Sequence, residues 1–239
     1  MKPEFGTVSS ALVALSGGVD SAVLLHCAKE AGLHVEAAIV VSEFLPSGEL
    51  QTAKSVAERE HVVLHVLPNA FLNNADIRRN PENRCYLCKK EISGLLKECA
   101  RERGLDAVLE GTNYSDGIRP GRRALEEEGI FSPLSAVSKE EIIAYAREHD
   151  IPVHPPSACL ATRVPVGTPL SKDHLALIDS AENCLRNAGI SGILRVRLSA
   201  DRHAAIEVEA FELATAELCA EKCKSLGITI DSISEYGRK

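Results

Sequence analysis

The first two thirds of the chain alternate between short apolar runs and segments in which apolar residues recur at helical spacing. The apolar runs are nearly continuous, which is typical of parallel strands covered by helices on both faces. The pattern predicts strands at residues 8–15, 35–42, 61–67 and 107–110, and helices at 21–31, 49–60, 83–103 and 138–150. This order predicts an α/β fold with a doubly wound parallel sheet. Ser138 and Glu141 form a capping box that marks the start of the last of these helices.

Residues 151–170 change the pattern because they contain five prolines, which interrupt regular elements. Beyond them the pattern predicts a helix at 171–188, strands at 193–198 and 204–209, a helix at 211–226 and a strand at 228–234. We therefore expect two domains: residues 1–165 with the parallel sheet, and a small α+β domain at residues 166–239.

The most informative local feature is Ser-Gly-Gly-Val-Asp-Ser at residues 16–21, between the first predicted strand and helix. The two glycines let the backbone approach a phosphate, and the first N–H groups of the helix point at it. Ser16 and Ser21 add hydroxyl donors, and Asp20 can hold a Mg²⁺ that bridges phosphate oxygens. A valine stands where a Walker A loop has its lysine, and the chain has no G-x-G-x-x-G motif. The segment therefore predicts a phosphate site of a different kind.

The composition and the net charge limit which classes of binding partner are expected. The net charge is −7, aromatic residues make up 4% of the chain, and tryptophan is absent. A broad nucleic-acid or membrane-surface interface needs a basic face, so neither partner is expected. No apolar run approaches the roughly 20 residues of a membrane span, and we expect a cytoplasmic protein. A small anionic ligand can still bind, because a few arginines around a site can outweigh the net negative charge of the protein there.

The cysteines fall into two groups. Cys85 and Cys88 form a C-x-x-C at helical spacing, which puts both sulfurs on one helix face, and Cys159 lies far away in the sequence. Three thiolates are one short of a closed Cys₄ site; a [4Fe–4S] cluster, zinc with His154 as fourth ligand, and a redox disulfide all remain open. The other cysteines lie in helical patterns among Ala and Leu and are interpreted as core residues: Cys27, Cys99, Cys184, Cys219 and Cys223.

Several motifs together resemble one family. The segment at residues 16–21 resembles the pyrophosphate loop of the HUP-like PP-loop ATP pyrophosphatases, which cleave ATP to AMP and pyrophosphate. The further motifs are Asn-Pro-Glu-Asn-Arg-Cys-Tyr-Leu-Cys-Lys at 80–89, Glu-Gly-Thr-Asn at 110–113, Arg-Pro-Gly-Arg-Arg-Ala at 119–124, Ser-Pro-Leu at 132–134, Ala-Cys-Leu-Ala-Thr-Arg at 158–163 and Arg-Val-Arg at 195–197. Their order and spacing resemble the LarE family, the ATP-dependent sulfur transferases of nickel-pincer nucleotide biosynthesis.

The resemblance implies a specific reaction. In this family a carboxylate of pyridinium-3,5-biscarboxylic acid mononucleotide attacks the α-phosphate of ATP, pyrophosphate leaves, and sulfur then displaces AMP to give a thiocarboxylate. One subtype sacrifices the sulfur of a single cysteine, and the other holds a [4Fe–4S] cluster on three cysteines. Since this chain matches all three cysteines, the cluster subtype is implied, with ATP, Mg²⁺ and the cluster as cofactors. Sulfide or another sulfur donor is the implied partner, and the implied assembly is a homo-oligomer, a hexamer.

Roles follow for the matching residues. The ATP phosphates and Mg²⁺ are assigned to Ser16, Gly17, Gly18, Asp20 and Ser21, with Ser42, Gly111 and Thr112 lining the nucleotide pocket. Catalytic roles are assigned to Asp20, Lys89, Cys159 and Arg163, the last toward the α-phosphate or the substrate. Substrate contacts are assigned to Arg119, Arg122 and Arg123, expected in a Gly/Pro loop beside Asp116, and to Arg195 and Arg197, which share one face of a strand. The cluster ligands are Cys85, Cys88 and Cys159.

An acyl-adenylate hydrolyses if water reaches it, so residues 151–170 are the expected lid. Three alternatives remain. A tRNA-thiolating enzyme of the same superfamily would need a basic surface. A non-catalytic zinc- and nucleotide-binding sensor would bind ATP without releasing pyrophosphate. An ammonia-using synthetase would leave the cysteines unexplained.

Overall fold

The protein is represented by a computed structural model that describes residues 1, 3–117, 119–155, 157–199 and 201–237. Contacts divide the chain into two compact units. The first comprises Met1–Ser42, Ser47–Asn69 and Asn83–His154; the second comprises Glu43–Pro46, Ala70–Glu82 and Pro155–Lys239. The expected domain division at residue 165 stays a prediction. Pro156, one of the five prolines in residues 151–170, lies outside the described residues.

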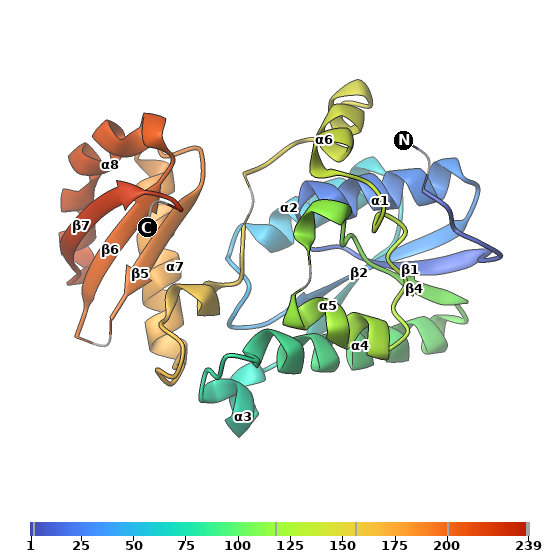
Figure 1. Ribbon diagram of the computed structural model, residues 1–239, viewed down its shortest axis with the longest axis horizontal. Helices are drawn as coiled ribbons and strands as arrows, with labels where there is room; N and C mark the ends of the chain where they lie inside the picture. Colours follow the sequence, from blue (N-terminus) through green and yellow to red (C-terminus); the bar gives the residue numbers. More distant parts are fainter. Residues whose placement is uncertain (2, 118, 156, 200, 238–239) are drawn as a thin grey trace. The chain divides into compact units, whose positions relative to one another are not determined.

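The first unit is a parallel sheet between helices, which confirms the α/β prediction. The strands are β1 (Ser10–Ala14), β2 (His34–Val41), β3 (Leu64–Pro68) and β4 (Ala107–Leu109), in the order β3-β2-β1-β4. All their pairings are parallel. The helices are α1 (Val19–Glu30), α2 (Glu49–Arg59), α4 (Arg84–Arg103), α5 (Pro120–Glu127) and α6 (Lys139–Glu148). Figure 1 shows α1 and α2 on one side of the sheet and α4 and α5 on the other.

The core of this unit surrounds the central strand. Ala11, Leu12 and Val13 of β1 have no exposed surface, as expected for a strand with helices over both faces. Leu12 packs in a cluster that includes Leu96 of α4 and Val108 of β4. Because β1 is held from both faces, its carboxyl end gives a fixed start for the loop at residues 16–18.

Two local features differ from the sequence predictions. Residues 119–124 are not a Gly/Pro loop: α5 begins at Pro120, whose fixed φ and missing N–H suit the first helical position. The prediction failed because Pro-Gly was taken as a turn signal. The third strand begins at Leu64 rather than at residue 61, because His61 has a left-handed φ of 51° and the chain is still turning there.

The second unit is a small α+β structure, as predicted. Helix α7 (Lys172–Asn187) precedes a sheet of β5 (Leu194–Leu198), β6 (His203–Val208) and β7 (Thr229–Glu235). β5 and β6 are antiparallel, whereas β6 and β7 are parallel. The single helix predicted at 211–226 is wrong: the segment consists of the 3₁₀ turn η4 (Ala210–Glu212), the α-helix α8 (Leu213–Ala220) and the 3₁₀ helix η5 (Glu221–Leu226).

Two short segments from earlier in the chain belong to the second unit through direct contacts. The Leu160 N–H donates to the Phe44 carbonyl at 2.9 Å, and the Phe44 and Phe71 rings stack at 5.1 Å. The Gly167 N–H donates to the Asn80 carbonyl at 2.8 Å. These segments include η1 (Phe71–Asn73) and α3 (Ala75–Arg78). The later part of the expected lid is therefore anchored in this unit, and any closing motion would carry these contacts with it.

Candidate active site

The loop between β1 and α1 forms a tight turn that is held by hydrogen bonds among its own residues. Gly17 has a left-handed φ of 83°, and a Cβ there would meet the carboxylate and carbonyl of Glu49 at the start of α2. The Ser16 N–H donates to the Ser21 hydroxyl at 3.2 Å, and that hydroxyl donates to the Gly18 carbonyl at 2.9 Å. Helix α1 begins with Gly18 as its N-cap and no side-chain cap. Its first N–H groups and its positive dipole end are thus directed at this turn, as an anion site requires.

The segment after β4 packs against the first turn of α1. A Cβ on Gly111 would lie 3.0 Å from the Ser21 nitrogen and 3.1 Å from the Asp20 carbonyl carbon. Only glycine fits this approach without displacing backbone. The next residue, Thr112, donates its N–H (3.0 Å) and its hydroxyl (2.7 Å) to the buried Glu110 carboxylate. Gly111 therefore offers close backbone approach, whereas both donors of Thr112 are already bound.

Asp20 has a partner that the sequence did not indicate. The Lys139 ammonium lies 2.7 Å from both carboxylate oxygens of Asp20. Lys139 is the first residue of α6 and directly follows the N-cap Ser138, whose hydroxyl accepts the Glu141 N–H at 3.2 Å. The sequence shows that Lys139 follows a capping serine, but no pattern along the chain connects this lysine with Asp20. An ammonium ion beside a carboxylate at a phosphate loop can turn to a phosphate oxygen when a ligand binds.

The position of Asp20 also suits a residue that binds magnesium. It lies in the first turn of α1 and its side chain is 27% exposed, so a hydrated cation can reach it. Mg²⁺ in such sites takes one or two carboxylates together with phosphate oxygens. Ser42 directly follows β2, and Ser16 and Gly111 follow β1 and β4 closely. In a parallel sheet these strand ends share one edge, where ligands of open α/β sheets bind.

Cys85 and Cys88 lie in the first two turns of α4, with Cys85 exposed and Cys88 half-buried. Lys89 follows them, and its side chain packs against α5, since a Cβ on Gly121 would lie 3.2 Å from the Lys89 Cγ. Two thiolate sulfurs at this spacing can both be ligands of one metal ion or iron–sulfur cluster. Cys159 belongs to the second unit, where it precedes η3 (Leu160–Arg163). Within the described parts of the chain no three His, Cys, Asp or Glu side chains are gathered as a metal site. The three-cysteine ligand set therefore stays a prediction.

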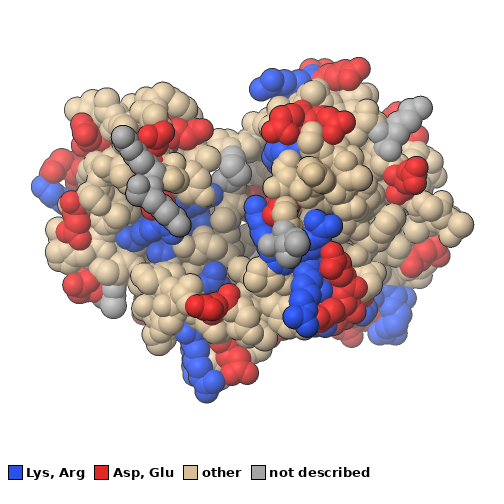
Figure 2. Space-filling model, in the orientation of Figure 1, with Lys and Arg blue, Asp and Glu red and all other residues tan. Residues whose placement is uncertain are grey.

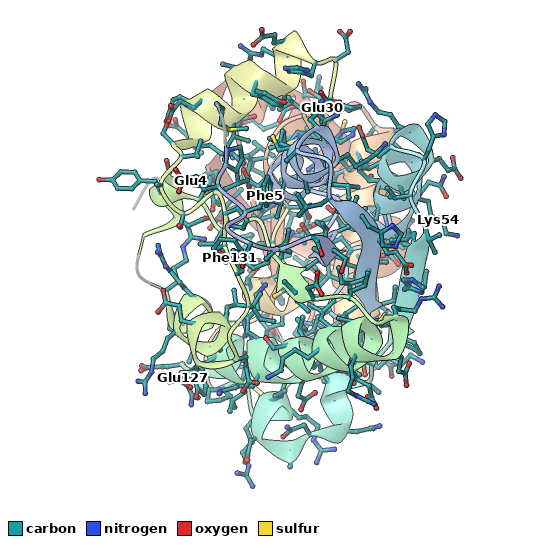
Figure 3. The ribbon with its side chains drawn as sticks, turned by 90° about the vertical axis from the view of Figure 1, so that its right-hand side faces the viewer. Glu4, Phe5, Glu30, Lys54, Glu127 and Phe131 are labelled. Atoms are coloured by element: carbon teal, nitrogen blue, oxygen red, sulfur yellow. The ribbon has the colours of Figure 1, made fainter. Side chains whose placement is uncertain are left out.

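The arginines of α5 lie among acidic side chains. Arg122 pairs with Glu126 at 3.0 Å and Arg123 with Glu127 at 2.8 Å, both one helical turn apart. Arg119, the N-cap of α5, has a looser contact of 3.3 Å with Asp116 and is 67% exposed. Figure 2 shows this mixture of charges over α4 and α5, and Figure 3 shows Glu127 on the outer side of α5. Hydrogen bonds from Tyr86, Arg123 and Lys90 lower the pKa of Glu127 to about 2.

Arg163 is bound within the second unit rather than exposed. Its side chain is 1% exposed and forms a bidentate pair with Glu182, with Nε and Nη2 each at 2.9 Å from a carboxylate oxygen. Its Nη1 donates to the carbonyls of Ala158 (2.7 Å) and Cys159 (3.1 Å). In this arrangement Arg163 holds the turn that carries Cys159. Its assigned contact with the α-phosphate or the substrate stays a prediction.

Arg195 and Arg197 lie two residues apart on β5, as expected. Arg195 is buried; its Nη1 donates to the Leu194 carbonyl at 2.7 Å, and its guanidinium lies 5.6 Å from the Tyr236 ring centroid. Burial lowers the pKa of Arg195. Arg197 forms a bidentate pair with Glu207, through Nε at 2.6 Å and Nη2 at 2.8 Å. A phosphate at this strand would have to compete with the partners that both arginines already have.

The turn after the inner strand β1 carries the Ser-Gly-Gly-Val-Asp-Ser segment that resembles the PP-loop class of ATP-using enzymes. Comparison with known proteins agrees: residues 10–80 match the family of the queuosine biosynthesis protein QueC. The chain is 34% identical to an uncharacterized protein of Synechocystis, covering 81% of this chain and 74% of the relative. It is 31% identical to the pyridinium-3,5-bisthiocarboxylic acid mononucleotide synthase of Lactiplantibacillus plantarum, covering 79% and 71%.

A similarity that covers less of both chains also concerns a sulfurtransferase. The chain is 31% identical to a tRNA-5-methyluridine(54) 2-sulfurtransferase of Thermotoga maritima, over 60% of this chain and 51% of that protein. The chain belongs to the LarE family of ATP-dependent sulfurtransferases, as its motifs indicated. Among the helices of the described residues, none combines the length and the hydropathy that crossing a bilayer requires.

Proposed function

We propose that this protein activates a carboxylate of pyridinium-3,5-biscarboxylic acid mononucleotide with ATP and replaces one carboxylate oxygen with sulfur. The observation that carries the proposal is the Asp20–Lys139 pair at the N-terminus of α1, beside a glycine turn built for phosphate. A relative of the same family, 31% identical, is named for making the corresponding bisthiocarboxylic acid.

In the first step a carboxylate oxygen of the acid bonds to the α-phosphorus of ATP, and the bond from that phosphorus to pyrophosphate breaks. The α1 N–H groups, Ser16 and Ser21 hold the departing pyrophosphate, and Asp20 would hold a Mg²⁺, which would supply positive charge there. Lys139 and Lys89 add positive charge where negative charge develops. Gly111 lets the nucleotide lie close to the backbone, with Ser42 and Thr112 beside it.

In the second step a sulfur nucleophile bonds to the acyl carbon and AMP leaves, which gives the thiocarboxylate. Cys85, Cys88 and Cys159 are the proposed ligands of a [4Fe–4S] cluster, which when bound supplies a labile sulfide. Arg163 contributes by fixing the carbonyls of Ala158 and Cys159 and thereby the position of the Cys159 thiol. Residues 151–170 are the proposed lid, and the proposed assembly is a homo-oligomer, a hexamer.

The decisive experiment separates the two steps. Protein purified without oxygen is given Mg-ATP with and without the dicarboxylic acid, and pyrophosphate and thiocarboxylate are measured separately. We expect pyrophosphate only when the acid is present. Cys85→Ala, Cys88→Ala and Cys159→Ala should each abolish thiocarboxylate and leave pyrophosphate release largely intact, and Cys99→Ala, a core cysteine of α4, is the matched control.

Each contrary result has a distinct meaning. ATP binding without acid-dependent pyrophosphate release would refute adenylation and favour a nucleotide sensor. Pyrophosphate release that depends on tRNA instead of the acid would favour the hypothesis of a tRNA-thiolating enzyme. Zinc in place of iron and acid-labile sulfide would refute the cluster. A loss of mass equal to one H₂S at Cys159 after turnover would indicate that this cysteine itself gives up its sulfur.

A further inference from the structure

The Lys139 ammonium has to change partners at the phosphate loop. It lies 2.7 Å from both carboxylate oxygens of Asp20 in the nucleotide-free protein. Asp20 has to give up part of this contact before it can hold Mg²⁺, and the ammonium then turns to a phosphate oxygen. Because lysine carries its charge on a flexible four-carbon stem, the ammonium keeps its place during this exchange only if the backbone of Lys139 is held independently of Asp20.

A short turn after β4 supplies such a hold. This turn is the 3₁₀ helix η2 (Tyr114–Asp116). The Ser115 hydroxyl accepts the Lys139 N–H at 3.0 Å, and the Tyr114 N–H donates to the Val137 carbonyl at 2.9 Å. The two hydrogen bonds lie on either side of the N-cap residue of α6. The turn therefore holds the start of α6 at two points.

The N–H of Lys139 needs an acceptor from outside its helix. Lys139 is the first residue of α6, and the first N–H groups of a helix have no acceptor within it. The capping box of α6 satisfies a different group, because the Ser138 hydroxyl accepts the Glu141 N–H at 3.2 Å. Ser115 thus makes a contact that the helix does not supply for itself.

The turn that carries Ser115 is held by a buried side chain. Asn113 is 2% exposed, and its side-chain oxygen accepts the Ser115 N–H at 2.9 Å. Its own N–H donates to the Asp116 carboxylate at 3.1 Å, which completes a capping box around the turn. Because both ends of the turn are bound, the backbone of Ser115 has a fixed position before any ligand arrives.

The same stretch of chain also contacts the partner of Lys139. A Cβ on Gly111 would lie 3.1 Å from the carbonyl carbon of Asp20, so the two backbone segments touch. Residues 111–115 therefore join the start of α1, which carries Asp20, to the start of α6, which carries Lys139. This stretch sets the separation of the two charged groups, in addition to their own attraction.

We propose that Ser115 is a positioning residue for pyrophosphate release: its hydroxyl holds the backbone of Lys139 while the ammonium moves from Asp20 to a phosphate oxygen. The inference rests on the proposed function and adds a residue that acts through Lys139. A charge that is displaced by about 1 Å stabilises the transition state much less. Loss of the hydroxyl should therefore slow the first step, whereas ATP binding, which the glycine turn and the α1 N–H groups support, should stay normal.

The test is a double-mutant cycle on the rate of acid-dependent pyrophosphate release at saturating ATP and acid. We expect Ser115→Ala to slow release about fivefold to tenfold, as for the loss of one hydrogen bond, and Ser115→Thr, which keeps a hydroxyl, to be normal. Combined with Lys139→Met, Ser115→Ala should add less than about a twofold further loss, because the group that it positions is already gone.

The matched control is Ser171→Ala, which removes a serine hydroxyl that accepts the His174 N–H at 3.3 Å in the first turn of α7. It should release pyrophosphate at the wild-type rate. ATP affinity and thermal unfolding should be equal in Ser115→Ala and Ser171→Ala. Amide hydrogen exchange at Lys139, followed by NMR, should be faster in Ser115→Ala and normal in Ser115→Thr.

The contrary results are distinct. Normal pyrophosphate release in Ser115→Ala, unchanged amide exchange at Lys139, or losses that multiply in the double variant would overturn the positioning role and leave the proposed function intact. A normal rate in Lys139→Met would overturn the roles of both residues. Wild-type protein that releases no pyrophosphate with the acid would refute the proposed function and this inference with it.

Discussion

Replacement of Arg163 tests whether the turn that carries Cys159 depends on a buried ion pair. Arg163 is 1% exposed and the Glu182 side chain 11%. Arg163→Ala removes both hydrogen bonds to Glu182 and both to the carbonyls of residues 158 and 159. Among the described residues, Glu182 then keeps the hydrogen bond from the Val196 N–H, at 2.9 Å, and the electrostatic interaction with Arg186 and Arg195.

The magnitude follows from that geometry. A buried carboxylate that loses its cation, together with carbonyls that lose a donor, costs about 3–5 kcal/mol of stability. Replacing both partners with apolar groups of similar volume, as in Arg163→Met with Glu182→Leu, removes the unpaired charge, and such replacements are often neutral. We therefore expect the double variant to be more stable than Arg163→Ala.

The assay is equilibrium unfolding in urea, with the free energy of unfolding extrapolated to water. Lys224→Ala is the control, because Lys224 pairs with Glu221 at an exposed site and such pairs contribute at most about 1 kcal/mol. In Arg163→Ala the thiocarboxylate yield should also fall further than pyrophosphate release. The reasoning is refuted if Arg163→Ala costs no more than Lys224→Ala, or if the double variant is the least stable of the set.

Three further predictions concern single residues. Gly111→Ala should cost about 1–3 kcal/mol of stability and impair ATP binding, measured by calorimetry, because its Cβ would press on the Ser21 nitrogen; normal ATP affinity would contradict this. Lys139→Met should lower the rate of pyrophosphate release about a hundredfold or more with little change in stability, whereas Lys54→Met, exposed on α2 (Figure 3), should be normal; an equal effect of both would contradict the role of Lys139. Burial, with the neighbouring Cys184 and Cys219 thiols, raises the pKa of Cys223 from 9.0 to about 11. Because the folded state keeps this proton longer than the unfolded chain, the free energy of unfolding should fall between pH 9 and pH 11, and less so in Cys223→Ala; equal slopes in the two proteins would contradict it.

The sequence by itself determined the features that depend on neighbours along the chain. Nearly continuous apolar runs between helical segments specify a parallel sheet because each strand is buried on both faces. The glycine turn at residues 16–18 and the Ser138–Glu141 capping box are likewise local, since the hydrogen bonds that define them join residues at most five positions apart. These elements agree with the structure to within a few residues.

Only the tertiary structure decided which distant charges meet. Lys139 reaches Asp20 across 119 positions, and Tyr86 reaches Glu127 across 41, because packed helices bring their ends together. The motif alone also could not show that folding places Arg163 opposite Glu182 and away from solvent; its role toward the α-phosphate or the substrate stays a prediction. Sequence periodicity reports which face of an element is buried; which side chain pairs with which depends on how those faces dock, and that information is not local.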